Sequence, residues 1–299
     1  TFQTHARFYL NNLPRLATRV EHVEALRKGI LDLAVTGRLV PQNENEAPAN
    51  DTLSSIAQVR LELIDQKALK RSQPIQNKIS LRAEVQIPST WRWVSCDQIF
   101  FVTKLAGFEY TKHFDLRDEG AVPVIRAQNV RPWKVSLENL KYISAPVSEA
   151  LPRSALNRPC LLVTFIGAGI GDVAFFEPDG PWHLAPNVAK MEFFNGCEKY
   201  ACWDYLNLFF NSPAGRREIY KHVKSTAQPS LSMRTLRDID VPFPPLQEQR
   251  RIVAKVDELM ALCDDLETAI RTQSETSQRL LDAAIREALA DPQPALEVA

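Results

Sequence analysis

The chain has 299 residues, longer than most single domains, and contains 36 Lys and Arg residues against 36 Asp and Glu residues. Hydrophobic residues make up 45% of it and charged residues 24%, values that exclude a fibre or a disordered chain and are typical of a folded globular protein. Because the net charge is zero, any attraction to nucleic acid must come from a local surface.

The cysteines and the apolar runs indicate the compartment. Five scattered cysteines include no Cys-x-x-Cys pair, so the sequence predicts no disulfide framework and favours a reducing environment. No apolar run approaches the ~18 residues of a membrane span, and the first ten residues do not have the pattern of a signal peptide. We therefore expect a cytoplasmic protein without a membrane partner.

Residues 1–83 are predicted to be a helical N-terminal segment followed by a linker. Apolar residues spaced by three, four and three predict a helix with one buried stripe over about 19–39. A second helix is predicted over 52–71, and 72–83 form the linker. The expected helix-pairing residues of the first helix are Val23, Leu26, Ile30 and Leu33.

Residues 84–244 have a different pattern, with short runs of β-branched and aromatic residues separated by turn residues. Residues 200–224 instead have helical spacing. This stretch is predicted to be a mixed α/β domain. The clearest strand candidates are 122–130, 140–144, 160–166, 172–177 and 189–194.

Residues 245–299 carry the strongest periodic signal in the chain. Spacings of four and three alternate from Ile252 to Ala284, which is a heptad pattern and predicts a long helix over 245–290 with a helical partner. The expected pairing residues are Ile252, Val256, Leu259, Cys263, Leu266 and Ile270. The fold class is therefore α+β, a globular mixed α/β domain with long helices that form a coiled coil.

A glycine-rich segment at residues 167–171 superficially resembles a dinucleotide or S-adenosylmethionine loop. Such a loop must open a helix, whereas residues 173–176 are strand-like and lead into the turn 178–180. The context favours a glycine-mediated hairpin or sheet bend, and an enzyme that uses this loop remains the less favoured alternative.

The chemistry-bearing side chains form no recognisable catalytic or metal-binding pattern. Cys197, Cys202, His183 and His222 match no common zinc spacing. No nucleophile signature and no Asn-Pro-Pro-Tyr or Asp-Pro-Pro-Tyr motif occurs. We expect no catalytic residue, no metal and no cofactor in this chain.

Two clusters of basic and polar residues are candidates for DNA contact. Residues 216–237 hold six Lys and Arg residues, one acid and a loop of hydroxyl and amide side chains, which suits phosphate contacts. Residues 104–134 combine Arg with Gln and Asn, which pair bidentately with guanine and adenine. A solvated surface is the alternative for each residue. The candidates are Lys104, Tyr110, Thr111, Lys112, Arg126, Gln128, Asn129, Arg131, Lys134, Lys221, Lys224, Ser225, Thr226, Gln228, Ser230 and Arg234.

Several segments together resemble the specificity subunit of type I restriction-modification systems, over about residues 21–290. The most specific match, at 225–267, is similar to the junction between a target recognition domain and a conserved helix. The matching segments are VEALRKGILDLAVTGRLVPQNENEAPAN, GFEYTKHFDL, VPVIRAQNV, LLVTFIGAGIGDVAFFEPDGPWHLAPNVAKM and STAQPSLSMRTLRDIDVPFPPLQEQRRIVAKVDELMALCDDLE.

The resemblance implies a DNA-binding subunit without catalysis of its own. It implies that the domain reads one half-site of a bipartite double-stranded target, and that the helices act as a spacer and dock methyltransferase subunits. Those subunits would bind S-adenosylmethionine and methylate adenine, and restriction or translocase subunits are further candidate partners.

One departure leaves the assembly open. Full-length members of the family carry two recognition domains, whereas this chain has one. Either it is a half-size subunit that pairs with its own copy or with a second half-subunit, or it is one half of a longer chain. A coiled-coil scaffold that sequesters partner subunits without reading DNA is the alternative function.

Overall fold

The computed structural model describes residues 19–43, 45–69, 81–105, 107, 115–223 and 230–290. Residue contacts divide the chain into a unit formed by 31–256 and a second formed by 1–30 with 257–299. We call the first the two-sheet unit and the second the helix-pair unit. The boundaries predicted at residues 83 and 244 do not coincide with this division. The helix α3 (Ala49–Asp65) contacts the short helix α4 (Cys96–Ile99). The start of α10 (Leu246–Ala290) forms hydrogen bonds with Gln42 and Cys202 of the same unit.

The N-terminal helices of the sequence prediction are present. α2 (Val20–Val35) lies within the range predicted for it, and α3 (Ala49–Asp65) is shorter at its C-terminal end than the predicted 52–71. After α2 the chain turns at Gly37, where φ is +71° and a Cβ atom would lie 2.4 Å from Pro88. Only glycine combines that backbone with so close an approach.

The first sheet is antiparallel and has the strand order β2-β9-β6-β7. Its central strands are fully buried; β6 is apolar up to its last residue, whereas β9 carries Lys190 and Glu192. The strands are β2 (Phe100–Lys104), β6 (Cys160–Thr164), β7 (Val173–Phe176) and β9 (Val188–Phe193).

The second sheet has the order β4-β3-β8-β5 and contains one parallel pair, β3 with β8. Apolar side chains of the two sheets share one core, to which Ile125, Leu162 and Leu184 contribute. The prediction of strand over 122–130 was too long, since the chain turns into a short 3-10 helix after Ile125. The elements are β3 (Val122–Ile125), η2 (Ala127–Asn129), β4 (Lys141–Ile143), α6 (Ala145–Glu149), β5 (Ala155–Leu156) and β8 (Trp182–Leu184).

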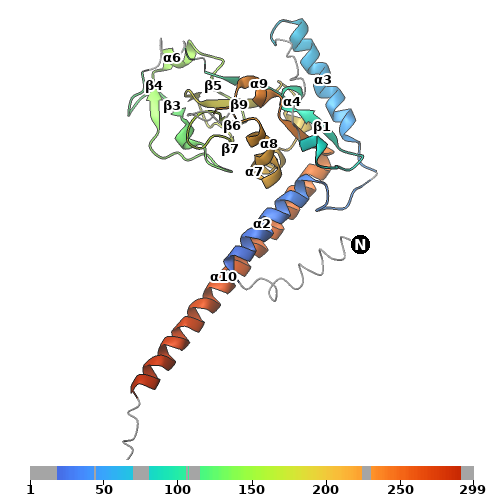
Figure 1. The fold of residues 1–299 in the computed structure, drawn as a ribbon. Helices are drawn as coiled ribbons and strands as arrows, with labels where there is room; N and C mark the ends of the chain where they lie inside the picture. Colours follow the sequence, from blue (N-terminus) through green and yellow to red (C-terminus); the bar gives the residue numbers. More distant parts are fainter. Residues whose placement is uncertain are drawn as a thin grey trace, which may run out of the picture. The chain divides into compact units, whose positions relative to one another are not determined.

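The helical stretch predicted over 200–224 contains two helices, α7 (Trp203–Asn211) and α8 (Pro213–Lys221). The break falls at Ser212, because Pro213 has no N–H for α7 and instead opens α8. The Ser212 hydroxyl accepts a hydrogen bond from Gly215 N at 3.0 Å and so caps α8. α7 lies against β7 and β6 (Figure 1).

The two-sheet unit, named for its two four-stranded sheets, also contains a small two-stranded sheet. β1 (Arg92–Ser95) pairs antiparallel with β10 (Asp240–Phe243), so residues about 150 positions apart in sequence meet. The remaining short elements are η1 (Leu81–Ala83), α4 (Cys96–Ile99), η3 (Glu198–Tyr200) and α9 (Met233–Arg237).

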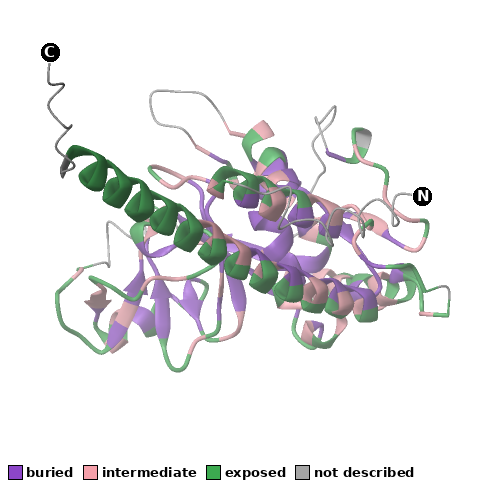
Figure 2. Ribbon diagram, turned by 90° about the horizontal axis from the view of Figure 1, so that it is seen from below, coloured by how far each residue is buried: buried purple, intermediate pink, exposed green. Residues whose placement is uncertain are grey.

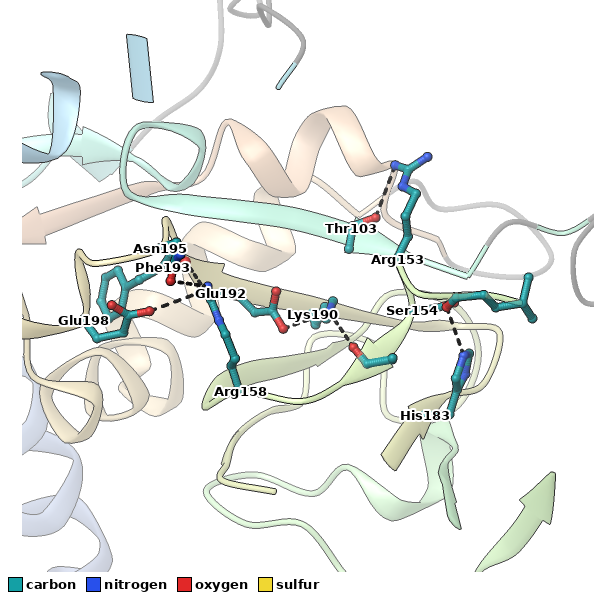
Figure 3. A network of polar contacts seen from close by, with 12 residues as sticks. Thr103, Arg153, Ser154, Arg158, His183, Lys190, Glu192, Phe193, Asn195 and Glu198 are labelled. Carbon is teal, nitrogen blue, oxygen red and sulfur yellow. Dashed lines mark hydrogen bonds and ion pairs between the residues drawn. The ribbon is translucent and has the colours of Figure 1, made fainter. Parts of the chain in front are cut away.

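A buried polar network links the two sheets (Figure 3). Lys190 on β9 donates to the carbonyl of Ala155 on β5 at 2.6 Å and to Glu192 at 2.8 Å. The side chains of Lys190 and Glu192 are 5% and 10% exposed. His183 on β8 lies with its Nδ1 atom 2.9 Å from the carbonyl oxygen of Leu184. These charged and polar groups are satisfied within the fold.

The C-terminal helix matches its prediction to one residue. α10 (Leu246–Ala290) has 45 residues, or about 68 Å at 1.5 Å per residue. None of the helices in the described part of the chain has an apolar stretch long enough to cross a bilayer.

The helix-pair unit is held by charge and by apolar burial. Arg27 of α2 donates to Asp264 at 2.5 Å and to Glu267 at 2.6 Å, which holds the two helices side by side (Figure 1). From Arg271 to Leu289 every residue of α10 is exposed (Figure 2). The predicted pairing residues are divided between the two units, since Leu33, Ile252 and Val256 belong to the two-sheet unit. Of the whole set, Val23, Ile30, Ile252, Val256, Leu259 and Cys263 are buried, and Leu26, Leu33, Leu266 and Ile270 are half-buried.

Candidate nucleic-acid interface

The glycine-rich segment forms the connection of a hairpin. β6 and β7 pair antiparallel from Cys160 with Phe176 to Val163 with Val173, which confirms the predicted hairpin. Gly167, Gly169 and Gly171 all have positive φ, between +81° and +93°. The loop closes where Gly171 N donates to Thr164 O at 2.8 Å. No helix begins in this loop, so its N–H groups do not form the anion site of a cofactor loop.

Helix α8 supports the glycine loop from one side. The Tyr220 hydroxyl donates to the carbonyl of Ile170 at 3.2 Å and accepts from Arg216 at 2.9 Å. Arg216 also pairs with Asp172 at 3.4 Å. A Cβ atom at Gly171 would lie 3.1 Å from Ile219. The loop is therefore attached both to the sheet and to α8, and its conformation is fixed by both.

Two candidate residues lie beside the same loop. The Lys104 ammonium stands 4.7 Å from the centre of the Phe165 ring, and Ser230 forms a β-bridge with Ile166. Leu231 N donates to Phe165 O at 2.8 Å. Lys104 and Ser230, each about 60 positions from the hairpin in sequence, thus both lie at the glycine loop.

A tight turn at residues 131–134 lies next to the start of β7. Arg131 N and Lys134 N each donate to the other's carbonyl, and Val130 forms a bridge with Val135. Trp133 N donates to the carbonyl of Val173, the first residue of β7. Arg131, Trp133 and Lys134 are all exposed, so this turn displays two cations and one aromatic side chain.

Asn129, by contrast, is 1% exposed and its amide is used within the fold. Its Oδ1 accepts from Arg126 N at 3.1 Å, and its Nδ2 donates to the carbonyls of Ser136 and Glu138, both at 3.0 Å. These contacts join the residues that precede the 131–134 segment to those that follow it. Gln128 beside it is exposed and Arg126 is half-buried, donating to the carbonyl of Asn139.

The basic side chains of α8 have carboxylate partners. Lys221 pairs with Glu84 at 2.6 Å and Arg217 with Asp32 at 3.8 Å. These partners reduce the positive charge that α8 presents. Arg234 on α9 is exposed. The candidates Tyr110, Thr111, Lys112, Lys224, Ser225, Thr226 and Gln228 lie outside the described residues.

The cysteines are free thiols, and four of them are buried. Burial raises the pKa of the Cys160 and Cys202 thiols above the ordinary value of 9.0, so the reactive thiolate is disfavoured at both. In the described ranges, His, Cys, Asp and Glu side chains form no group that could hold a metal ion.

Sequence reasoning missed the residues that hold the 131–134 turn. Asn207 on α7 donates to the Trp133 carbonyl at 3.1 Å, and the Oδ1 of Asn211 accepts from Trp133 N at 3.1 Å. Asn211 is 6% exposed on a helix that is otherwise apolar on its buried side. Two asparagines four residues apart in such a helix indicate that polar groups of another segment lie against it, because a buried amide requires polar partners.

Comparison with known proteins places these features in a family. The chain is 26% identical over 275 residues to the Type I restriction enzyme EcoAI specificity subunit of Escherichia coli, covering 90% of this chain and 45% of that protein. It is 25% identical over 289 residues to the EcoEI specificity subunit of the same organism, with 93% and 46% covered. The chain thus spans about half the length of the curated relatives it matches.

Among solved structures, the HsdS subunit from Thermoanaerobacter tengcongensis aligns with a TM-score of 0.44 and 17% identity, over 89% of this chain and 56% of that one. The family model of the type I restriction modification DNA specificity domain matches residues 88–276. This range includes both sheets, α7, α8 and much of α10, the elements that carry the surface described above. As the match covers more than half of its residues, the chain belongs to the type I restriction-modification DNA specificity family.

Proposed function

We propose that this chain is a DNA sequence-specificity subunit of a type I restriction-modification complex, without catalysis of its own. In this proposal, the two-sheet unit reads one half-site of a bipartite duplex target. The observation that carries the proposal is the match of the specificity domain to residues 88–276. The fold supports it by gathering polar and basic loops around one hairpin.

The DNA contact is proposed to lie around the glycine loop. Lys104 and Ser230 meet there, and the cations of the 131–134 turn are exposed nearby. Lys and Arg side chains supply the phosphate contacts that dominate affinity, while loop side chains at the base edges supply specificity. Asn129 is assigned to the fold instead, because its amide already has three partners within the chain.

The long helix is proposed to set the spacing of the half-sites and to pair outside this chain. Leu280, Leu281, Ile285 and Leu289 are 48–81% exposed on its distal half, and grouped exposed apolar side chains mark protein–protein contacts. A helical partner would bury it. A length of about 68 Å corresponds to about two turns of B-DNA. We propose a second copy or a second half-subunit as the partner, in a cytoplasmic complex.

Methyltransferase subunits are proposed to dock on the same helices and to bring S-adenosylmethionine, which this chain is not expected to bind. Restriction or translocase subunits are further candidate partners. If the chain pairs with its own copy, the two recognition units are related by a two-fold axis, and the target has palindromic halves.

The test is adenine methylation across the host genome, read by single-molecule sequencing with the gene intact, deleted and restored. We expect one bipartite motif to lose methylation on deletion and to regain it on restoration. Symmetric halves would support self-pairing. An unchanged methylation pattern, together with failure of the purified complex to bind any duplex, would overturn the proposal in favour of a scaffold protein.

Two matched variant genes, each returned to the deletion strain, test separately whether α10 pairs through its exposed apolar residues. The Leu280→Glu/Ile285→Glu variant places charges on the exposed apolar positions of α10, whereas Glu275→Gln/Asp282→Asn changes exposed polar positions of the same helix. We expect the first variant to sediment as a smaller species and to fail to restore methylation, while the second restores it. Equal sedimentation of both variants with wild type would exclude pairing through these residues.

A further inference from the structure

The most unusual backbone in the two-sheet unit belongs to Trp133, whose φ is +76°. Bulky residues avoid this left-handed region because Cβ approaches the backbone too closely. The other described residues with positive φ, apart from glycines, are Lys67, Asn139 and Asn187, and asparagine tolerates this region. A tryptophan there is strained, and such strain persists only where surrounding contacts fix the backbone.

Those contacts come from elements distant in sequence. Trp133 N is shared between the Val173 carbonyl and the Asn211 side chain, both at 3.1 Å, and its carbonyl accepts from Asn207 at 3.1 Å. Asn211 in turn donates to the Val173 carbonyl at 3.1 Å. Every contact is to the backbone of Trp133, so none of them explains why the side chain is an indole.

The indole is left on the surface. It is 42% exposed, and of the five tryptophans, all within the described residues, it alone is exposed. An isolated exposed aromatic is common on proteins. Here, however, the side chain stands on a rigid turn between two exposed cations, Arg131 and Lys134, and neither forms an ion pair with any carboxylate in the described part of the chain.

The turn lies beside the glycine loop. Its anchor, Val173, directly follows Asp172, which pairs with Arg216 of α8. The cations, the indole and the loop are thus joined through one strand end. Uncompensated positive charge favours a polyanion over another protein surface, and a rigid aromatic side chain loses little conformational freedom on binding.

We propose that residues 131–134 form a preorganised DNA contact, in which the Trp133 indole packs against the sugars and base edges of a groove while Arg131 and Lys134 bind phosphates. This inference rests on the proposed function. Trp133 then contributes affinity that does not depend on salt, and the two cations contribute the salt-dependent part. The strained backbone keeps the indole in position before DNA arrives.

The test uses the full chain with its methyltransferase partners and a fluorescent duplex that carries the motif found by methylation mapping. Trp133→Gly removes the indole and suits the positive φ, so we expect an unfolding temperature close to that of wild type and DNA binding about tenfold weaker or more. The dependence of DNA binding on salt concentration should be the same in Trp133→Gly as in wild type. Trp133→Phe should retain most of the affinity. Arg131→Ala and Lys134→Ala should each reduce the salt slope by about 1.

Lys67→Gly is the matched control, because it also places glycine at a positive-φ position. It removes an exposed side chain that is distant in sequence from the 131–134 turn. It should bind as wild type does. If wild type binds no duplex, the proposed function fails. If wild type binds and Trp133→Gly binds equally, this inference fails. Loss of methyltransferase binding in Trp133→Gly, with DNA binding unchanged, would assign the turn to a protein contact and also overturn it.

Tryptophan emission provides a second readout that a structural role would not change. The difference in emission between wild type and Trp133→Phe reports the exposed indole. We expect the duplex to alter this difference signal and to protect it from iodide quenching. Full access of iodide to Trp133 in the DNA complex would contradict the contact.

Discussion

The charges of the sheet core and the charges of the 131–134 turn obey opposite rules. Lys190 and Glu192 lie between the sheets with each other and with a backbone carbonyl as partners. Arg131 and Lys134 are exposed on a turn and form no ion pair within the described ranges. A charge with its partners inside the chain serves the fold, whereas one without them is available to a ligand.

The largest expected effect comes from breaking the buried pair. Lys190→Met leaves Glu192 buried without its cation, which should lower the free energy of unfolding by about 3–5 kcal/mol. Urea unfolding of the full chain measures it. The double variant Lys190→Met/Glu192→Met should recover most of the loss, since it removes both charges. Lys199→Met, at an exposed lysine, is the control and should change little.

The turn should behave in the opposite way. Arg131→Ala/Lys134→Ala is expected to leave the free energy of unfolding within about 0.5 kcal/mol of wild type. Duplex binding at about 0.1 M salt should weaken by about tenfold for each cation, because two counterion releases are lost. Fluorescence anisotropy against salt concentration measures this. A stability loss comparable to that of Lys190→Met would show that the two regions do not differ as we argue.

Lys221 tests an intermediate case, since it is a candidate phosphate contact that already pairs with Glu84 at 2.6 Å. Glu84→Gln should release the ammonium and strengthen binding to duplexes of any sequence by about threefold, at low salt above all. Lys221→Ala should abolish that gain in the double variant. Unchanged binding by Glu84→Gln would mean that Lys221 does not approach the DNA.

The smallest effect is expected from the surface pair of the helix-pair unit. Hydrogen bonds from Arg27 and then Arg271 lower the pKa of Glu267 below its ordinary value of 4.5. A lowered acid pKa stabilises the fold above that ordinary value, and the contribution is lost as the pH falls through the lowered pKa. Arg27→Leu should therefore reduce the unfolding temperature slightly at pH 7, and the reduction should become smaller as the pH falls below 4.5. A reduction that does not change with pH would assign the effect to packing.

Regular features could be predicted from the sequence because their signals are local. The heptad spacing located α10 to one residue, and short runs of β-branched and aromatic residues located β4, β6, β7 and β9. The hairpin followed from the strand-like residues after the glycines. The two-stranded sheet of β1 and β10 was not recognised as a pair, because its partners are about 150 residues apart and each strand has four residues.

The candidate interface was less predictable, since it depends on which side chains find partners. Asn129 has a side chain that can read a base edge. Its amide is instead used by the carbonyls of the turn around it, which the sequence does not reveal. Lys221 meets a carboxylate 137 positions earlier. Trp133 falls within the predicted cluster 104–134 but is not among the named candidates. Its backbone is held by Asn207 and Asn211, 74 and 78 positions later in the chain, so the residues around Trp133 do not encode its positive φ.

The way in which α7 holds the turn has a consequence for variation. At residue 133, Asn207 and Asn211 bond only to the main-chain carbonyl and N–H, so the attachment uses no side chain of positions 131, 133 and 134. The turn is thus a display site: its chemistry can be exchanged while its geometry is retained. A library randomised at these three positions should yield mostly folded proteins, and selection on different duplexes could move recognition without redesign of the sheets.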